Sequence, residues 1–543
     1  MAGIIVLDPL SEEGLALLRS SGNMEVEVRT GLKGDELREA LMGADGAICR
    51  SGVKITADIL EGNTRLRAIA RAGVGVDNID CKKATEQGIV VMNTPGGNTL
   101  STAEQAIALM MALSRNIFPA YKSLTEGRWD RKKFTGTQLA GKTLGIVGLG
   151  RIGQAVAIRC AAMDMKLIGY DPYISAARAK ELGITMYETV DEVLPHVDYL
   201  TVHTPLTNET RDLINTKQVG LLKPGARLIN AARGGIYNEA ALVEGLKSGK
   251  IGGVALDVYP EEPCTDSPLF GMDHVLCTPH LGASTEEAQE NVALEAAQLL
   301  LDYFTTGTIR QSVNSSSLDP KTLVDVKDWL VAAYRLGLFV SQFDRAAMHG
   351  CKLTFRGEIT QKDTTLVAKA FAVGLMERSI DSGTGVNIVN AEVLLKRRGI
   401  ELVEERETGD SKEFQSTIRV RATTDAGLLE AVATLFGDSV RLVRLNGCRL
   451  ESPLEGNLLV FTHRDLPGVI GQVGGVFGQH DVNIAAMTVG RASATSGSEA
   501  LGVLSLDAPV PSDAVVSLLS LPAISKAVAL TLPAHGVLPT WLS

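Results

Sequence analysis

Residues 144–153 read LGIVGLGRIG, in which an apolar run leads into the glycine pattern GxGxxG. The pattern consists of Gly148, Gly150 and Gly153. The apolar run predicts a buried strand, and residues 154–162 predict a helix directly after the glycines. Backbone N–H groups at the start of such a helix can face a pyrophosphate. Because strand, glycines and helix occur in this order, the stretch predicts a dinucleotide-binding turn.

The next apolar run, residues 166–170, ends on Asp171. An acid about 20 residues after the glycines can accept hydrogen bonds from the hydroxyl groups of the adenosine ribose. The same carboxylate would repel a 2′-phosphate, and the following Pro172 and Tyr173 offer no arginine to bind one. The sequence therefore predicts NAD rather than NADP as the cofactor.

Strand and helix patterns alternate up to about residue 312. The strand-like runs lie at residues 4–7, 46–49, 68–70, 144–147, 167–170, 199–203, 228–230, 253–255 and 275–278. Such alternation predicts an α/β fold with doubly wound parallel sheets. Two longer periodic segments, residues 102–115 and 285–304, predict helices that cross between two lobes.

Composition narrows the class of protein. A chain of 543 residues is expected to form three or more domains. Its net charge of −10, without a dense run of Lys and Arg, argues against nucleic acid or an anionic membrane as the main partner. Seven scattered cysteines without CxxC spacing suggest neither a disulfide framework nor a zinc site. With no signal-like N-terminus and no apolar run of membrane-spanning length, the cytoplasm is the expected location.

The second half of the chain has a different organisation. Residues 312–320, SVNSSSLDP, predict a linker. Residues 321–450 mix helix and strand patterns with charged clusters, and nothing there indicates catalysis. From Asn457 onward the predicted order is strand, helix, strand, strand, helix and strand, which is typical of a ferredoxin-like module.

Three segments carry groups suited to hydride transfer from a secondary alcohol, which needs a proton acceptor and a cation that binds the carboxylate. Arg233 follows the run 228–230, and its planar guanidinium can bind a carboxylate with two hydrogen bonds. Glu262 lies in an acidic segment, and His280 follows another apolar run. Spacing alone leaves open whether Glu262 touches His280. If it does, the carboxylate would orient the imidazole and raise its pKa.

Five ordered motifs resemble the D-2-hydroxyacid dehydrogenase family: GLGRIG, VHTPLTNETRDLIN, NAARGG, ALDVYPEEP and PHLGAST. The resemblance implies that Arg233 contacts the carboxylate and keto oxygen of the substrate, that His280 is the acid and base, and that Glu262 supports His280. It also implies a flavodoxin-like substrate lobe, residues 1–97 and 283–312, and an inserted Rossmann NAD lobe, residues 98–282.

The resemblance also implies ligand contacts. Those expected for NAD are Val74, Gly148, Gly150, Arg151, Ile152, Gly153, Asp171, Thr204, Ala231, Arg233, Asp257, His280 and Gly282. The motifs RAGVGVDNID and WDRKKF further resemble the family members that oxidise D-3-phosphoglycerate. They imply substrate contacts at Arg50, Ser51, Arg71, Asn78 and Arg131, the last donated by a neighbouring subunit. From the residues alone, Arg131 would belong to a solvated basic turn, and the glycines of RAGVG would form an ordinary turn.

Residues 458–491 resemble an ACT domain, a small-molecule sensing module that is expected to span residues 457–543. The matching effector contacts are His463, Asp465 and Asn483, which implies L-serine as a ligand. Asp465 stands where some serine-inhibited relatives carry Asn. A module used only for subunit assembly is the alternative. Residues 321–450 resemble the intervening, allosteric substrate-binding domain of the long members of the family.

The expected function is NAD-dependent oxidation of D-3-phosphoglycerate to 3-phosphohydroxypyruvate, the first step of the phosphorylated route to L-serine, by a homotetramer. One alternative is the same chemistry on hydroxypyruvate, glyoxylate or 2-oxoglutarate. Another is an NAD-sensing scaffold of the corepressor type, which shares the fold. No metal, nucleic acid or membrane is expected as a partner.

Overall fold

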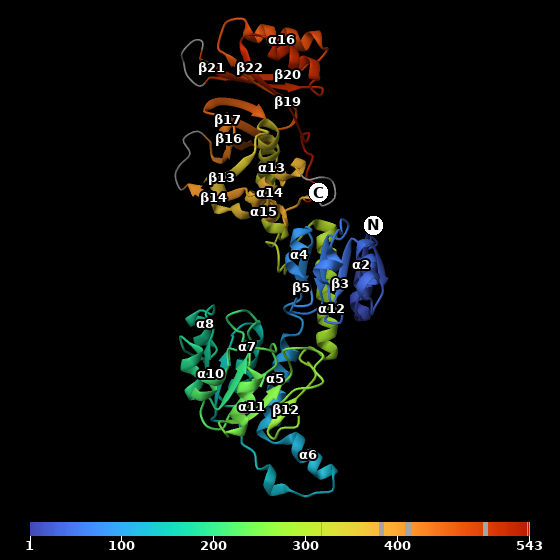
Figure 1. Ribbon diagram of the computed structural model, residues 1–543, viewed down its shortest axis with the longest axis vertical. Helices are drawn as coiled ribbons and strands as arrows, with labels where there is room; N and C mark the ends of the chain where they lie inside the picture. The colour runs from blue at the N-terminus through green and yellow to red at the C-terminus, as the bar shows by residue number, and fades with distance from the viewer. Residues whose placement is uncertain (317, 380–384, 408–413, 492–497, 540, 542–543) are drawn as a thin grey trace.

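The computed structural model describes residues 1–316, 318–379, 385–407, 414–491, 498–539 and 541. Within these ranges the chain forms four sheets. Figure 1 shows an elongated molecule in which the N-terminal sheet lies in the middle. The second sheet lies towards one end, and the third and fourth sheets lie towards the other.

The first sheet has five parallel strands in the order β2-β1-β3-β4-β5. The strands are β1 (Ala2–Val6), β2 (Met24–Val28), β3 (Gly46–Cys49), β4 (Ala68–Arg71) and β5 (Val90–Asn93), and the helices between them are α1 (Glu12–Ser20), α2 (Gly34–Met42), α3 (Ala57–Leu60) and α4 (Cys81–Glu86). Ile4 and Val6 join one buried cluster, while Ile5 and Leu7 join another, so both faces are covered. The strand order is the flavodoxin-like one expected from the family resemblance.

The second sheet has seven parallel strands in the order β12-β11-β10-β9-β6-β7-β8. The strands are β6 (Thr143–Val147), β7 (Lys166–Tyr170), β8 (Thr185–Met186), β9 (Tyr199–Val202), β10 (Ala226–Asn230), β11 (Ile251–Leu256) and β12 (Val275–Cys277). Its helices include α7 (Arg151–Ala162), α8 (Ala176–Glu181), α9 (Val190–Val193), α10 (Thr216–Leu221) and α11 (Glu239–Lys247). The order reverses between β6 and β9, as in Rossmann folds. The predicted doubly wound α/β architecture is confirmed.

Helix ends differ from the sequence prediction by a few residues. Helix α5 (Thr99–Ser114) begins at Thr99 rather than at residue 102. Helix α12 (Glu286–Thr306) begins after Thr285, whose hydroxyl accepts a hydrogen bond from Ala288 N–H. Helix α7 begins at Arg151 rather than at residue 154, because Gly150 is already its N-cap.

The segment that follows α12 is an irregular connection to the next helix, as the linker prediction implies, but it also contacts the first sheet. Val313 N–H donates to Val91 O at 2.9 Å, and Val91 N–H donates to Asn314 Oδ1 at 2.8 Å. The segment therefore pairs with the edge strand β5, whose backbone groups would otherwise lack partners on that side. Asn314 Nδ2 also donates to Ile89 O at 2.8 Å.

The third sheet is mixed, with the strand order β14-β13-β15-β16-β17-β18. Its strands are β13 (Met348–Gly357), β14 (Glu401–Glu407), β15 (Ser416–Thr424), β16 (Gly427–Phe436), β17 (Ser439–Leu445) and β18 (Cys448–Pro453), and its helices are α13 (Pro320–Phe343), α14 (Thr364–Met376) and α15 (Ala391–Arg397). Helices α13 and α14 pack closely, because Gly337 and Gly374 bring their backbones together. This unit has the α+β composition that was expected.

The fourth sheet is antiparallel, with the order β20-β21-β19-β22. Along the chain the elements are β19 (Gly456–Arg464), α16 (Val469–Gln479), β20 (Ile484–Arg491), β21 (Glu499–Leu506), α17 (Ser512–Leu519) and β22 (Ile524–Leu532). The predicted ferredoxin-like βαββαβ order is confirmed. In the ranges that the structure describes, no helix has both the length and the apolar character that crossing a membrane requires.

Arg335 of α13 joins the third unit to the fourth. Its side chain is 3% exposed, and its guanidinium donates to Leu454 O at 3.1 Å and to Ala534 O at 2.8 Å. Glu455 lies 3.2 Å away and supplies the opposite charge. The buried guanidinium of Arg335 thus connects the fourth unit to the third.

Replacing Arg335 with Ala is expected to destabilise the packing of the fourth unit by about 3 kcal/mol, because two carbonyl oxygens lose their donor and Glu455 loses its partner. Differential scanning calorimetry checks this through the lowest melting transition. The exposed Arg345, replaced in the same way, is the control. Equal melting profiles for the two variants would contradict the assignment.

Candidate active site between the first two sheets

The three glycines of the dinucleotide turn have different steric surroundings. Gly148 has φ +91°, and a Cβ there would lie 2.7 Å from His203 O. A Cβ at Gly153 would lie 2.0 Å from Gly148 O, so this glycine allows α7 to pack against the turn. A Cβ at Gly150 would meet nothing within 4 Å. The turn is therefore closed around Gly148 and Gly153 and open at Gly150, where a pyrophosphate can approach the backbone.

Asp171 closes the other side of this turn. Its Oδ2 accepts a hydrogen bond from Leu149 N–H at 2.6 Å, and its Oδ1 accepts from Tyr173 N–H at 2.7 Å and from Ile174 N–H at 3.2 Å. Oδ2 can accept a further hydrogen bond. The acid thus fixes the glycine turn and keeps acceptor capacity for ribose hydroxyls.

The remaining residues predicted to bind the cofactor divide into two groups. Thr204 lies beside Gly148, and its Oγ1 is buried without a hydrogen-bond partner among the described residues. Ala231 is buried in the same core cluster as Leu149 of the turn. Ile152 packs partly buried against that core, and the guanidinium of Arg151 lies beside Gly96. A buried hydroxyl without a partner beside the glycine turn can hydrogen-bond a polar cofactor.

Asp257 organises the turn that carries His280. It is fully buried and accepts hydrogen bonds from Leu281 N–H and Gly282 N–H, both at 2.8 Å, and from Thr278 Oγ1 at 2.5 Å. Its role in the structure is therefore to hold a backbone turn. His280 has φ +57°, a conformation that needs such support in a residue other than glycine.

His280 and Glu262 are brought into contact by the fold. Nδ1 of His280 lies 2.6 Å from Glu262 Oε2, and Glu262 Oε1 accepts from Tyr259 N–H at 3.0 Å. Burial raises the pKa of Glu262, but the hydrogen bonds from His280 and Tyr259 and the positive charges nearby outweigh it, so the pKa lies below its ordinary value. Nε2 of His280 has no hydrogen-bond partner among the described residues and remains available to a substrate.

Arg233 sits in a recess that a glycine provides. Its Nη1 donates to Ala232 O at 2.7 Å, and its Nε donates to Asp77 Oδ2 of the first unit at 3.2 Å. A Cβ at Gly75 would lie 1.8 Å from Arg233 Nη2. The guanidinium therefore occupies the space that any side chain at position 75 would need.

A glycine also leaves room for the guanidinium of Arg71. A Cβ at Gly73 would lie 1.6 Å from Arg71 Nη1. The glycines of RAGVG are thus not an ordinary turn, as their pattern alone suggested, but recesses for two guanidinium groups. Val74 lies between them, and its carbonyl accepts from Asn93 Nδ2 at 2.5 Å.

The predicted substrate residues of the first sheet lie around this loop. Burial lowers the pKa of Arg71, and the charges of Arg233 and Arg50 act in the same direction. Arg71 Nε is buried without a partner in the described chain. Asn78 Nδ2 donates to Arg50 O and to Val53 O, both at 2.7 Å, so its amide group holds the loop that carries Arg50 and the exposed Ser51.

Arg131 is not brought to this cluster within one chain. It lies in a short 3-10 helix (Arg131–Phe134) after α6 (Ile117–Thr125), and in Figure 1 this arm projects from the end of the molecule that carries the second sheet. Its exposed apolar side chains are Ile117, Phe118, Tyr121, Leu124 and Trp129.

The three predicted effector residues do not converge within one chain either. His463, at the end of β19, is buried, and its Nδ1 donates to Arg464 O at 2.8 Å while Nε2 has no partner among the described residues. Asp465 pairs with Arg491 at 2.8 Å. Asn483, which precedes β20, donates to Asp507 at 2.7 Å. The strand register places it near the start of β19, about 20 Å from His463 at 3.3 Å per residue.

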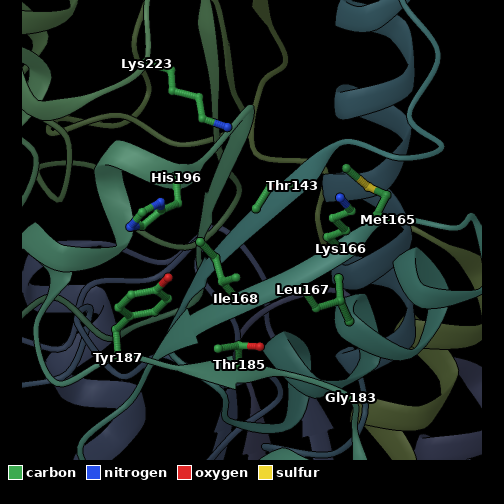
Figure 2. A pocket seen from close by; sticks show the side chains of 10 residues that line it. All are labelled: Thr143, Met165, Lys166, Leu167, Ile168, Gly183, Thr185, Tyr187, His196 and Lys223. Carbon is green, nitrogen blue, oxygen red and sulfur yellow. The ribbon is translucent and has the colours of Figure 1, made fainter.

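A separate hollow of about 560 Å³ lies at the opposite edge of the second sheet, where β6 and β7 begin. Figure 2 shows its lining, with Lys223 and His196 on one side and Lys166 on the other. Arg233 and His280 follow strands at the carboxyl edge, so this hollow is not part of the site.

Some functional positions escaped the sequence analysis. Gly75 and Asp77 lie within the RAGVGVDNID motif, which was the available signal, but only the fold shows that they contact Arg233. Asp8 accepts from Arg50 N–H at 2.6 Å and supports the same loop from β1. A single acid after a strand carries no signal of that role.

Replacing Gly75 with Ala is expected to leave the fold intact, because the new methyl group meets mobile side-chain ends, and to displace the Arg233 guanidinium. A displacement of about 1 Å can lower the rate by about 100-fold. Steady-state kinetics of NAD reduction measure kcat/KM, with Gly220→Ala, which adds a methyl group in open space, as the control. Unchanged kinetics in Gly75→Ala would show that the recess is unimportant.

Comparisons with known proteins show the family of the chain. Three family models match the chain: the NAD binding domain of D-isomer specific 2-hydroxyacid dehydrogenases at residues 107–282, the D-3-phosphoglycerate dehydrogenase intervening domain at 325–446, and the ACT domain at 457–521. D-3-phosphoglycerate dehydrogenase of Methanocaldococcus jannaschii is 39% identical over 98% of this chain and 100% of its own length. The enzyme of the same name from Bacillus subtilis is 38% identical over 98% of this chain and 100% of its own length.

Solved structures match the first two sheets. TT0316 protein from Thermus thermophilus is 34% identical, with a TM-score of 0.53, over 57% of this chain and 99% of its own. D-lactate dehydrogenase from Escherichia coli is 28% identical, with a TM-score of 0.51, over 57% of this chain and 99% of its own. With relatives that match along almost its whole length, the chain belongs to the D-3-phosphoglycerate dehydrogenase family of D-isomer-specific 2-hydroxyacid dehydrogenases.

Proposed function

We propose that the protein oxidises D-3-phosphoglycerate to 3-phosphohydroxypyruvate with NAD, the first step of the phosphorylated route to L-serine. The observation that carries this proposal is the cluster of Arg50, Arg71 and Arg233 beside the His280–Glu262 pair. Three cations suit a substrate with a phosphate at one end and a carboxylate at the other, and Asp77 holds Arg233, the cation that would bind the carboxylate.

The residues at hand suit the NAD that this family uses. Gly148, Gly150 and Gly153 leave the turn open where a pyrophosphate would lie, and Thr204 has a free buried hydroxyl. Asp171 would accept from the ribose hydroxyls. When bound, NAD accepts the hydride that leaves the hydroxyl-bearing carbon.

The side chains divide the remaining chemistry. Arg233 holds the substrate carboxylate, and its position is set by Ala232 O and Asp77. His280 Nε2 accepts the hydroxyl proton, and the charge that it gains is balanced by Glu262 at Nδ1. In the reverse direction the same proton returns from His280 to the oxygen of the 2-oxo acid. Arg71 and Arg50 hold the phosphate.

NADH formation from D-3-phosphoglycerate and NAD, with a reagent that traps the product, tests the function. His280→Ala is expected to lower kcat by about 10²- to 10⁴-fold, a much larger effect than any change in NADH affinity from the lost cofactor contact. Reduction of glyoxylate, hydroxypyruvate or 2-oxoglutarate without oxidation of D-3-phosphoglycerate would favour a related dehydrogenase. NADH binding with negligible turnover of any acid would favour a scaffold of the corepressor type.

Arg71→Met tests the phosphate assignment. We expect the KM for D-3-phosphoglycerate to rise about tenfold or more, since a charge-assisted hydrogen bond is lost, while reduction of unphosphorylated hydroxypyruvate changes little. Arg29→Met, an exposed arginine of the same lobe, is the control. Equal losses with both substrates would place Arg71 in the fold rather than at the phosphate.

We further propose a homo-oligomer, a tetramer by family resemblance, in which the α6 arm covers a second copy and Arg131 reaches its site. The exposed apolar side chains of the arm support this, because patches of this kind mark interfaces. Sedimentation velocity of a variant carrying Tyr121→Asp and Leu124→Asp is expected to show smaller species. An unchanged sedimentation coefficient would remove the arm from the interface.

We propose L-serine as a ligand of the ACT module at His463, Asp465 and Asn483. The site requires a second copy of the chain, because Asn483 lies far from the other two residues within one chain. Inhibition of turnover by L-serine, measured with and without His463→Ala, tests the effector site.

We assign residues 1–97 and 283–312 to substrate binding, 98–282 to NAD, 321–450 to the intervening domain and 457–543 to the ACT domain. We also propose the cytoplasm as the location of the protein, since seven free cysteines are typical of a reducing compartment.

A further inference from the structure

The chain crosses between the first two units twice, and the two crossing segments contact each other. It leaves β5 through Pro95, Gly96 and Gly97 into α5, and it returns through α12, which spans the two units in Figure 1. A Cβ at Gly97 would lie 2.6 Å from Val292 Cγ1 and 2.9 Å from Val292 N. The outgoing segment therefore rests directly on the backbone of the returning helix, and no other side chain fits there.

Glu295 lies one turn further along α12, on the same side as Val292. Its carboxylate faces the backbone N–H groups of Gly96 and Gly97, and a Cβ at Gly96 would lie 3.7 Å from Glu295 Oε2. Burial raises the pKa of Glu295, whereas these N–H groups and the charges of Arg151 and Arg310 act the other way. A half-buried acid thus lies at the crossing, with its carboxylate close to Gly96 of the opposite segment.

Arg151 approaches the same point from the dinucleotide turn. It is the first residue of α7, directly after the open Gly150. Its Nη1 lies 3.5 Å from the place that a Cβ at Gly96 would take. Arg151 and Glu295 therefore both lie close to Gly96, and the positive charge of Arg151 acts to lower the pKa of Glu295.

We propose that Glu295 is a positioning residue for NAD, which holds the outgoing segment through Gly96 and Gly97 and directs Arg151 so that the open turn at Gly150 meets the pyrophosphate. Glu295 itself lies on the returning helix and reaches the turn only through Arg151. This inference rests on NAD being the cofactor, as in the proposed function, and it adds a residue that couples the lobe crossings to cofactor binding.

Glu295→Gln removes the charge and keeps the size of the side chain. We expect the Kd for NADH, measured by NADH fluorescence with the full-length protein, to rise about tenfold, and the KM for NAD to rise with it while kcat at saturating NAD changes less than threefold. Glu290→Gln, an exposed acid on the same helix, is the control and should leave the Kd within twofold. An unchanged or tighter Kd in Glu295→Gln would overturn the proposal.

A double-mutant cycle separates positioning from general support of the fold. If Glu295 acts through Arg151, then Arg151→Gln alone weakens NADH binding to a similar degree, and adding Glu295→Gln to it causes little further loss. Additive losses would overturn the proposal. Should Glu295→Gln fail to fold, Glu295→Asp replaces it in the cycle, with the same two outcomes.

These readouts are independent of the proposed substrate. If the protein binds NADH but does not oxidise D-3-phosphoglycerate, the proposed function is contradicted and the Kd measurement still tests Glu295. If turnover is normal and the Kd for NADH is unaltered in Glu295→Gln, only the inference about Glu295 is contradicted.

Discussion

Positive charge gathered around Arg71 is the constraint on which the rest of the candidate site depends. Arg50 follows β3, Arg71 ends β4 and Arg233 follows β10, and the charges of Arg233 and Arg50 add to burial in lowering the pKa of Arg71. Gly73 and Gly75 give the guanidinium groups of Arg71 and Arg233 the space that they need. A bound anion would offset the like charge that acts on Arg71, which is the physical basis of the proposed phosphate site.

Acids that accept hydrogen bonds from backbone N–H groups hold the loops around the candidate site. Asp8 holds the Arg50 loop, Asp171 holds the glycine turn, and Asp257 holds the turn of His280. Glu295 lies close to Gly96 where the chain crosses between the lobes. A carboxylate suits this task because it offers several acceptor positions at one point, whereas loops leave several N–H groups without partners.

Periodicity and turn chemistry were enough to predict both parallel sheets, the βαββαβ module and NAD as the cofactor, because those features depend on local patterns. Helix ends were predicted less well: α7 begins at Arg151, since Gly150 already serves as its N-cap. The linker after α12 was predicted, but its pairing with β5 through Val313 and Asn314 was not. Pairing of that kind depends on an edge strand more than 200 residues earlier in the chain, with Asn314 bonded to Val91 across 223 positions.

The sequence by itself determined the class of fold, the dinucleotide turn and the candidate residues Arg233, Glu262 and His280. Strand-helix alternation and glycine spacing depend on residues that are close together in the chain, so both can be recognised in the sequence. Only the tertiary structure decided that Glu262 touches His280 at 2.6 Å and that Gly75 makes room for Arg233. Contacts between distant segments depend on how sheets stack and cross, and residue spacing does not encode that geometry. For the same reason the sequence did not indicate Glu295, an unremarkable acid on a long helix until the fold sets it against Gly96.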